Sequence, residues 1–178
     1  MAPNQEKTLM DAAQLEAVLQ RLASQVLERQ GSDGPYKIVG IHTRGVPIAK
    51  RLAQRVKSTD PIGVLDINLY RDDLSTVADM PVVKETVMPF SIDGARVLLV
   101  DDVLYTGRTV RAALDALFDL GRPKKVELLA LVDRGGREIP LQADFCGKSL
   151  NVPEGEVVKV RLQETDGRDE VVVAPLER

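Results

Sequence analysis

The segment V-L-L-V-D-D-V-L-Y-T-G-R-T, residues 97–109, combines residue types that could hold a phosphorylated sugar. Its four apolar residues predict a buried strand, and Asp101 and Asp102 follow at the carboxyl end of that strand. Ligands of open α/β sheets bind outside the carboxyl ends of the strands. Two adjacent carboxylates would repel an anion, so we interpret them as acceptors for the hydroxyl groups of a sugar.

The turn after the two aspartates has the composition of a phosphate cradle. Thr106-Gly107-Arg108-Thr109 opens a helix predicted over 110–120, whose free N–H groups and positive dipole end attract a phosphate. Gly107 allows close backbone approach, and the two threonine hydroxyls add donors. Either half alone fits an ordinary strand end or helix cap, whereas the complete order favours a binding site. The segment matches neither a P-loop nor a dinucleotide-binding motif.

Helical and strand patterns alternate on both sides of this segment. Apolar residues at three- and four-residue spacing predict helices over 11–30, with Asp11 as the N-cap, and over 46–56. Short apolar runs predict strands, which we place at residues 36–41, 62–70, 82–88, 96–100, 125–132, 157–162 and 171–174. Residues 71–81 and 140–153 are expected to form loops. The alternation predicts an α/β fold whose mostly parallel sheet is covered by helices on both faces.

Composition excludes several classes of function. The 178 residues favour one domain, and a net charge of −3 argues against a protein that grips nucleic acid over its whole surface. The single cysteine, Cys146, and the single histidine, His42, argue against zinc sites and fit a reducing cytoplasm. The chain shows no signal-peptide pattern, and its apolar runs fall far short of the about 20 residues of a membrane span. We therefore expect a cytoplasmic protein without membrane contact.

Residues 97–109 resemble the phosphoribosyl-pyrophosphate signature of type I phosphoribosyltransferases. The likeness continues through I-H-T-R-G-V-P-I-A-K-R-L (41–52), L-Y-R-D-D-L (69–74) and L-V-D-R-G-G-R-E-I-P-L-Q-A-D-F-C-G-K (131–148). Together these segments resemble the bacterial pyrimidine operon regulators that also act as uracil phosphoribosyltransferases. The resemblance implies the type I phosphoribosyltransferase fold in a single domain over 1–178. It also implies a flexible hairpin loop at about 70–82 and a small hood at about 133–155 together with parts of the termini.

The resemblance implies that uracil reacts with 5-phosphoribosyl 1-diphosphate to give UMP and pyrophosphate, with Mg²⁺ as cofactor. The implied catalytic residues are Asp101, Asp102 and Arg44. The two acids would hold the ribose hydroxyls and, mostly through them, the metal, for which Asp133 is a further candidate ligand. The implied substrate-binding residues are Thr43, Arg44, Gly45, Arg71, Asp101, Asp102, Val103, Leu104, Tyr105, Thr106, Gly107, Arg108, Thr109, Asp133 and Arg134.

Positions linked to RNA binding depart from the family pattern. Gly136 stands where the family usually has a histidine, and Gln142 stands where it usually has an arginine. The remaining candidate contacts to leader mRNA are basic, namely Arg21, Arg29, Arg137 and Lys148. Two alternatives therefore stay open: an RNA-binding attenuator regulated by UMP with vestigial catalysis, and a phosphoribosyltransferase for another base. The family likeness also implies a homodimer or a higher homo-oligomer.

Overall fold

We describe the fold from a computed structural model, in which residues 6–70 and 85–177 are described. The expected loop over 71–81, the first part of the expected strand 82–88 and the candidate Arg71 lie outside these residues. Within them, Val87 makes a single antiparallel bridge to Val64. None of the helices in the described part is long and apolar enough to cross a membrane.

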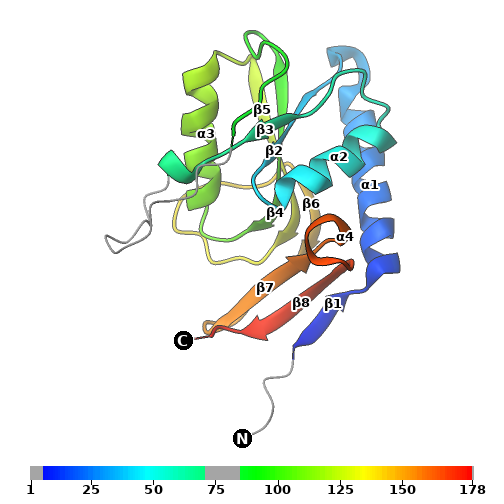
Figure 1. The fold of residues 1–178 in the computed structure, drawn as a ribbon, viewed down its shortest axis with the longest axis vertical. Helices are drawn as coiled ribbons and strands as arrows, with labels where there is room; N and C mark the ends of the chain where they lie inside the picture. Colours follow the sequence, from blue (N-terminus) through cyan, green and yellow to red (C-terminus); the bar gives the residue numbers. More distant parts are fainter. Residues whose placement is uncertain (1–5, 71–84, 178) are drawn as a thin grey trace, which may run out of the picture.

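A five-stranded parallel sheet carries the signature segment on its central strand. The strand order is β3-β2-β4-β5-β6, and every neighbouring pair runs parallel. In register, β4, β5 and β6 end level with one another at Leu104, Asp133 and Ser149, and Figure 1 shows these ends facing a second, smaller sheet. The strands are β2 (Lys37–Ile41), β3 (Gly63–Leu65), β4 (Arg96–Leu104), β5 (Lys125–Asp133) and β6 (Phe145–Ser149).

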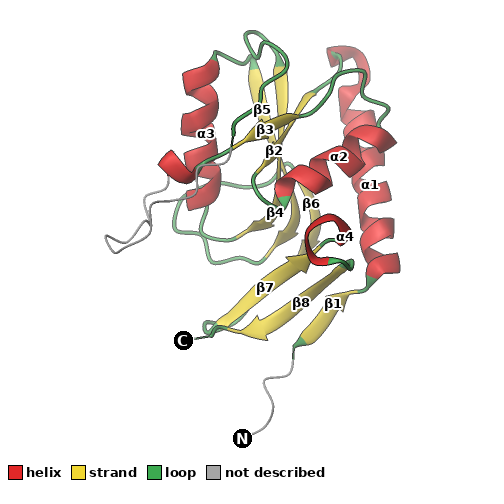
Figure 2. Ribbon diagram, in the orientation of Figure 1, coloured by secondary structure: helices red, strands yellow, loops and turns green. Residues whose placement is uncertain are grey.

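Helices cover both faces of this sheet, as the alternating pattern predicted. Helices α1 (Ala12–Gln30) and α2 (Gly45–Arg55) share one apolar core with one face of the sheet, and α3 (Arg108–Leu120) shares the core of the other face. Figure 2 shows the two groups of helices on opposite sides of the strands. The expected N-cap is confirmed: the Asp11 carboxylate accepts the N–H of Gln14 at 2.8 Å.

The second sheet is antiparallel and forms from segments near the two ends of the chain. Its order is β1-β8-β7, with β1 (Lys7–Met10), β7 (Glu156–Arg161) and β8 (Glu170–Pro175). The short helix α4 (Gln163–Asp166) lies in the connection between β7 and β8. In Figure 1 this small sheet lies below the carboxyl ends of the parallel strands. It therefore covers the edge at which α/β sheets bind ligands.

Several predicted boundaries differ from the structure. Of the strand expected over 62–70, only Gly63–Leu65 forms, because the Asp66 side chain accepts the N–H of Asn68 at 3.0 Å and the chain then enters a 3₁₀ turn, η2 (Asn68–Tyr70). The strand expected over 96–100 continues to Leu104, paired with β5. A second 3₁₀ turn, η1 (Gly31–Asp33), follows α1.

Part of the segment expected to form a hood, residues 133–155, lies in the large sheet. Residues 145–149, placed in a loop by the sequence, form β6 at the edge of the large sheet. This strand, F-C-G-K-S, lacks the β-branched pattern by which strands are recognised. The small sheet is formed by β7 and β8, which overlap the strands expected over 157–162 and 171–174, and by β1, which was not expected.

Candidate active site

Asp101 and Asp102 lie within β4, near its carboxyl end, rather than after the strand, because β4 continues to Leu104. Successive side chains of a strand point to opposite faces, so the two carboxylates have different surroundings. Asp101 is buried, with 5% of its surface exposed, and its Oδ1 accepts the N–H of Asp102 at 2.9 Å. Burial and the neighbouring Asp102 raise the pKa of the Asp101 carboxyl well above its usual range.

We expect the melting temperature of Asp101→Asn, measured relative to that of wild type, to increase as the pH rises. A carboxyl whose folded pKa is raised contributes its stability below the unfolded value, near 3.8, and this stability is lost as the pH rises through the folded pKa. Asparagine does not ionise, so the Tm of the variant minus the Tm of wild type should increase as the pH rises above about 4. Thermal melts across this range measure it, and a constant difference would contradict the assignment.

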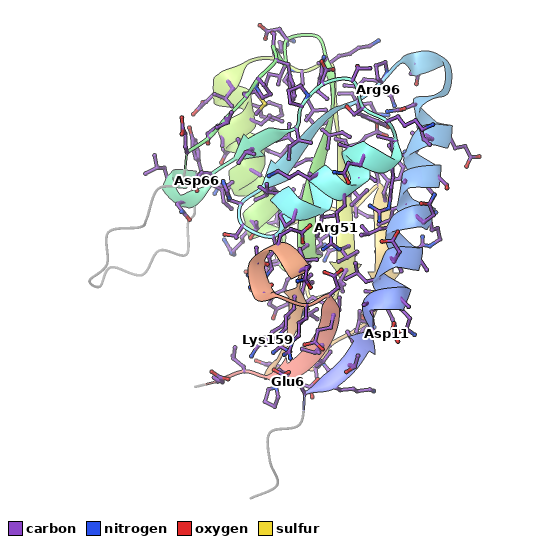
Figure 3. All side chains as sticks on the ribbon, turned by 45° about the vertical axis from the view of Figure 1, so that its right-hand side comes forward. Glu6, Asp11, Arg51, Asp66, Arg96 and Lys159 are labelled. Carbon is purple, nitrogen blue, oxygen red and sulfur yellow. The ribbon has the colours of Figure 1, made fainter. Side chains whose placement is uncertain are left out.

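A cavity of about 220 Å³ joins Asp102 to Arg44 at the end of β4. The sequence predicted that these two residues share a site, and the structure brings them together. The rest of the lining was not predicted, because it comes from the small sheet and from α4. Lys159 is labelled in Figure 3 on this small sheet, next to Glu6. The remaining lining residues are Val158, Lys159, Val160, Arg161 and Asp166.

Arg44 reaches the cavity from the loop between β2 and α2. It occupies the N-cap position of α2, and its Nη2 donates to Oδ1 of Asp166 at 2.8 Å. The preceding His42–Thr43 peptide bond is cis. Gly45 begins the helix against β4, where a Cβ atom would overlap the carbonyl oxygen of Val100. Glycine is therefore required for α2 to start this close to the signature strand.

The predicted phosphate turn forms the start of α3. Gly107 takes a left-handed conformation with φ of 91° at the N-cap position, and the Thr106 hydroxyl accepts the N–H of Arg108 at 3.2 Å. The carbonyl of Thr106 accepts the N–H groups of Glu138 and Ile139 at 2.9 and 3.0 Å. These contacts fix the turn, while Thr109 follows within the first turn of α3, at the positive end of the helix dipole.

Tyr105 and Arg134 form a stacked pair beside this turn. The Arg134 guanidinium lies 3.8 Å from the centre of the Tyr105 ring, and its Nη1 donates to the carbonyl of Glu156. Tyr105 keeps 44% of its surface exposed. The aligned strands also bring Leu104 next to Asp133 in register. The structure thus places Tyr105, Arg134 and Asp133 near the carboxyl ends of β4 and β5.

The Asp133 carboxylate, a candidate metal ligand, has two partners within the chain. It contacts Arg137 at 2.5 Å and accepts the N–H of Gly135 at 3.0 Å. Burial favours a higher pKa, but the hydrogen bonds from Arg137 and Gly135 hold the pKa of Asp133 below its usual value. Within residues 6–70 and 85–177, no group of three acidic, histidine or cysteine side chains could hold a metal ion.

The four candidate RNA-binding residues all contact other parts of the chain. Arg21 donates to the carbonyl of Gly147, and Lys148 donates to the carbonyl of Leu9 at 3.1 Å. Arg29 pairs with Glu127 at 3.0 Å. Besides Asp133, Arg137 donates to the carbonyls of Tyr105 and Leu141 at 2.8 and 2.7 Å. Arg21 and Arg29 lie on α1 and Lys148 lies on the adjacent β6, and all three are exposed, whereas Arg137 is half-buried.

The local structure explains why residue 136 is a glycine. Its φ is +82°, and a Cβ atom at this position would lie 2.5 Å from Cε2 of Tyr105. A larger residue, such as the histidine usual in the family, would need both a different backbone conformation and a shifted tyrosine. The departure at Gly136 thus accompanies the Tyr105–Arg134 stack.

Comparison with known proteins gives likenesses over nearly the whole chain. The model of the phosphoribosyl transferase domain matches residues 5–175. The "Bifunctional protein PyrR" of Deinococcus radiodurans is 53% identical over 166 residues, which cover 91% of this chain and 91% of that protein. The protein of the same name from Thermus thermophilus is 51% identical over 168 residues, which cover 92% of each chain.

Solved structures with the same fold are more distant in sequence. The hypoxanthine phosphoribosyltransferase of Trypanosoma cruzi has a TM-score of 0.72 at 18% identity, covering 97% of this chain and 98% of that one. A hypoxanthine phosphoribosyltransferase from Staphylococcus aureus has a TM-score of 0.71 at 19% identity, covering 98% of this chain and 92% of that one. These likenesses confirm the predicted fold class.

Proposed function

Because the chain belongs to the phosphoribosyl transferase family, and within it to the bifunctional PyrR proteins, we propose that it transfers a phosphoribosyl group to uracil. The products are UMP and pyrophosphate. The observation that carries this proposal is the cavity that joins Arg44 to Asp102 at the end of the signature strand. The phosphate turn at the start of α3 follows the same strand.

Each part of the site matches one part of the substrate. Thr106–Thr109 bind the 5′-phosphate at the positive end of α3. Asp101 and Asp102 bind the 2′- and 3′-hydroxyls of the ribose, and Arg44 binds the pyrophosphate. The bond between C1′ and the pyrophosphate oxygen breaks, the bond from C1′ to N1 of uracil forms, and the N1 proton is released. The positive charge that develops on the sugar is stabilised by the acidic pair.

The edge of β7 suits the base. Within the small sheet β7 pairs only with β8, and its residues Val158, Lys159 and Val160 line the cavity. An unpaired strand edge presents N–H and C=O groups in alternation. Uracil carries both kinds of complementary group, so we place it against this edge.

The residues of this site fit a Mg²⁺ ion that would be held jointly by oxygen atoms of the substrate and of the protein. Magnesium is usually held by one or two carboxylates together with substrate phosphates, and Asp101 and Asp102 supply carboxylates of this kind. Asp133 is paired with Arg137, so we assign it no metal. When bound, the ion would supply neutralising charge to the pyrophosphate. Arg44, which lines the cavity, would supply further positive charge to the pyrophosphate.

A panel of bases tests the proposed substrate. The protein is incubated with 5-phosphoribosyl 1-diphosphate, Mg²⁺ and radiolabelled uracil, hypoxanthine or orotate, and the nucleotide products are separated. We expect UMP as the main product. Formation of the hypoxanthine or orotate nucleotide at a higher rate would replace uracil as the substrate, and no nucleotide from any base would contradict the transferase assignment.

A second function is favoured by the names of the relatives, which call them bifunctional. We propose that the protein, as a cytoplasmic homo-oligomer, also binds the leader mRNA of a pyrimidine operon in a UMP-dependent way. Filter binding with the leader RNA of the source organism, with and without UMP, measures this. We expect tighter binding with UMP, and equal, salt-sensitive binding to unrelated RNA would contradict it.

A further inference from the structure

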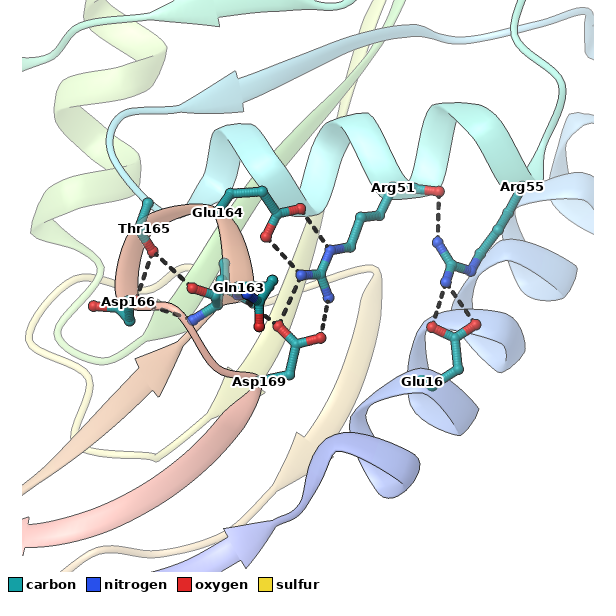
Figure 4. Close-up of polar contacts among 9 residues, drawn as sticks. Glu16, Arg51, Arg55, Gln163, Glu164, Thr165, Asp166 and Asp169 are labelled. Carbon is teal, nitrogen blue, oxygen red and sulfur yellow. Dashed lines mark hydrogen bonds and ion pairs between the residues drawn. The ribbon is translucent and has the colours of Figure 1, made fainter.

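The connection between β7 and β8, residues 162–169, is held on α2 by paired charges. Arg51 of α2 donates to Glu164 at 2.8 and 2.6 Å and to Asp169 at 2.9 and 2.8 Å. Figure 4 shows Arg51 between these two carboxylates, with α4 beside α2. Oδ1 of Asp169 also accepts the N–H of Gln163 at 2.7 Å. This clamp fixes the connection without using Arg44.

Asp166 extends from the same connection to the active-site arginine. One carboxylate oxygen, Oδ1, accepts from Arg44, while Oδ2 accepts the N–H of Leu162 at 2.9 Å and the hydroxyl of Thr165 at 2.6 Å. Burial favours a higher pKa, but the hydrogen bonds from Arg44, Thr165 and Leu162 lower the pKa of Asp166 to about 2. The carboxylate is therefore negatively charged at neutral pH and fixed at the wall of the cavity.

The Asp166 carboxylate lies where an anion bound to Arg44 in the cavity would lie. Arg44 and Asp166 both line the cavity that contains Asp102. Arg44 also stands at the N-terminus of α2, where the helix dipole favours a negative charge next to the cation. The side chains of Arg44 and Asp166 are 38% and 20% exposed, so water screens the pair and a more highly charged anion can replace the carboxylate.

We propose that Asp166 is a resident anion that occupies Arg44 in the free protein and competes with pyrophosphate for it. The inference rests on the proposed function, in which Arg44 binds the leaving pyrophosphate. Asp166 keeps its contacts to Leu162 and Thr165 after the exchange, so the connection stays on α2 while Arg44 turns to the ligand. The pair thus lowers the affinity of the site for pyrophosphate, which favours release of this product.

Titration calorimetry with magnesium pyrophosphate and the full-length protein tests the competition. An exposed ion pair of ordinary strength that must open first weakens binding roughly two- to sixfold, so Asp166→Asn should lower the Kd for pyrophosphate by about this factor. The asparagine oxygen can still accept the Leu162 N–H. Asp166→Ser is a second uncharged variant in case the first does not fold.

Asp169→Asn is the matched control, because it removes a charge from the same connection without contacting Arg44. We expect its Kd for pyrophosphate to match that of wild type. Unchanged or weaker binding by Asp166→Asn, or equal tightening by both variants, would overturn the competition while leaving the proposed function intact. Wild-type protein that does not bind pyrophosphate at all would overturn both.

Discussion

Asp102→Asn is expected to reduce kcat/KM for the formation of UMP by about 10- to 150-fold while the protein stays folded. Asp102 lines the cavity with Arg44, where its carboxylate can accept a ribose hydroxyl. Removal of one hydrogen bond to a charged group costs about 1.5–3 kcal/mol, and a contact felt in the transition state converts this cost into the stated loss of rate. Initial rates at varied 5-phosphoribosyl 1-diphosphate measure the effect.

Two further aspartates make this experiment specific. Asp115→Asn on α3 removes an exposed carboxylate. Within the described residues this carboxylate forms an ion pair with Arg111 on the same helix, so the rates of the variant should stay near those of wild type. Asp101→Asn should lose less activity than Asp102→Asn, because Asp101 is only 5% exposed and, unlike Asp102, does not line the cavity with Arg44. Wild-type turnover in both Asp101→Asn and Asp102→Asn would refute the role of the acidic pair.

The signature site was predictable because its order is local. Four apolar residues, two acids and a glycine turn specify a strand, a loop and a helix start within one short segment, and the geometry of parallel sheets places their junction at the ligand edge. The capping box of α1 was predictable for the same reason, since Asp11 and Gln14 lie one helical turn apart.

The wall of the cavity opposite the signature strand was not predictable from the same pattern. It depends on β1, β7 and β8, whose pairing joins residues from near the two ends of the chain, such as Thr8 and Val172. Alternation identifies a strand but not its partner, and Asp166 resembles any acid in a solvated turn. No local signal distinguishes the carboxylate that contacts Arg44 from the ones that contact Arg51.

The contact between Asp133 and Arg137 shows a different limit. Asp133 was a candidate metal ligand and Arg137 a candidate RNA contact, and the sequence did not predict that their side chains pair with each other. Their spacing of four residues, in D-R-G-G-R, was the available signal, but such a spacing indicates a contact only on a helix. Here two glycines with positive φ, Gly135 and Gly136, turn the chain back so that the pair can form.

Glu127→Gln is expected to destabilise the fold by about 3–5 kcal/mol, because it leaves the buried Arg96 without its counter-charge. Glu127 is 1% exposed, and its carboxylate accepts from Tyr36 at 2.6 Å, from Arg29 at 3.0 Å and from Arg96 at 3.2 Å. Arg96 is itself buried, so water cannot replace the lost charge. Urea denaturation at neutral pH measures the difference in the free energy of unfolding.

The pH dependence of this loss identifies its cause. Burial favours a higher pKa, but the hydrogen bonds from Tyr36, Arg29, Arg96 and Lys125 lower the pKa of Glu127 to about 2. A lowered pKa contributes stability above the unfolded value, near 4.5, and that stability is lost as the pH falls toward the folded pKa. The gap between wild type and Glu127→Gln should therefore narrow between about pH 5 and about pH 2, the opposite direction to that expected for Asp101.

The cluster around Glu127 also lies away from the site, which separates stability from catalysis. Glu127 is near the start of β5, and Figure 3 shows its partner Arg96 at the end of the molecule opposite to Lys159 of the cavity wall. We therefore expect the folded fraction of Glu127→Gln to keep wild-type KM values. Glu28→Gln, on the exposed face of α1, is the matched control and should change the unfolding free energy by less than about 0.5 kcal/mol. A comparable decrease in the unfolding free energy of both variants would contradict a stabilising role of the buried pair Glu127–Arg96.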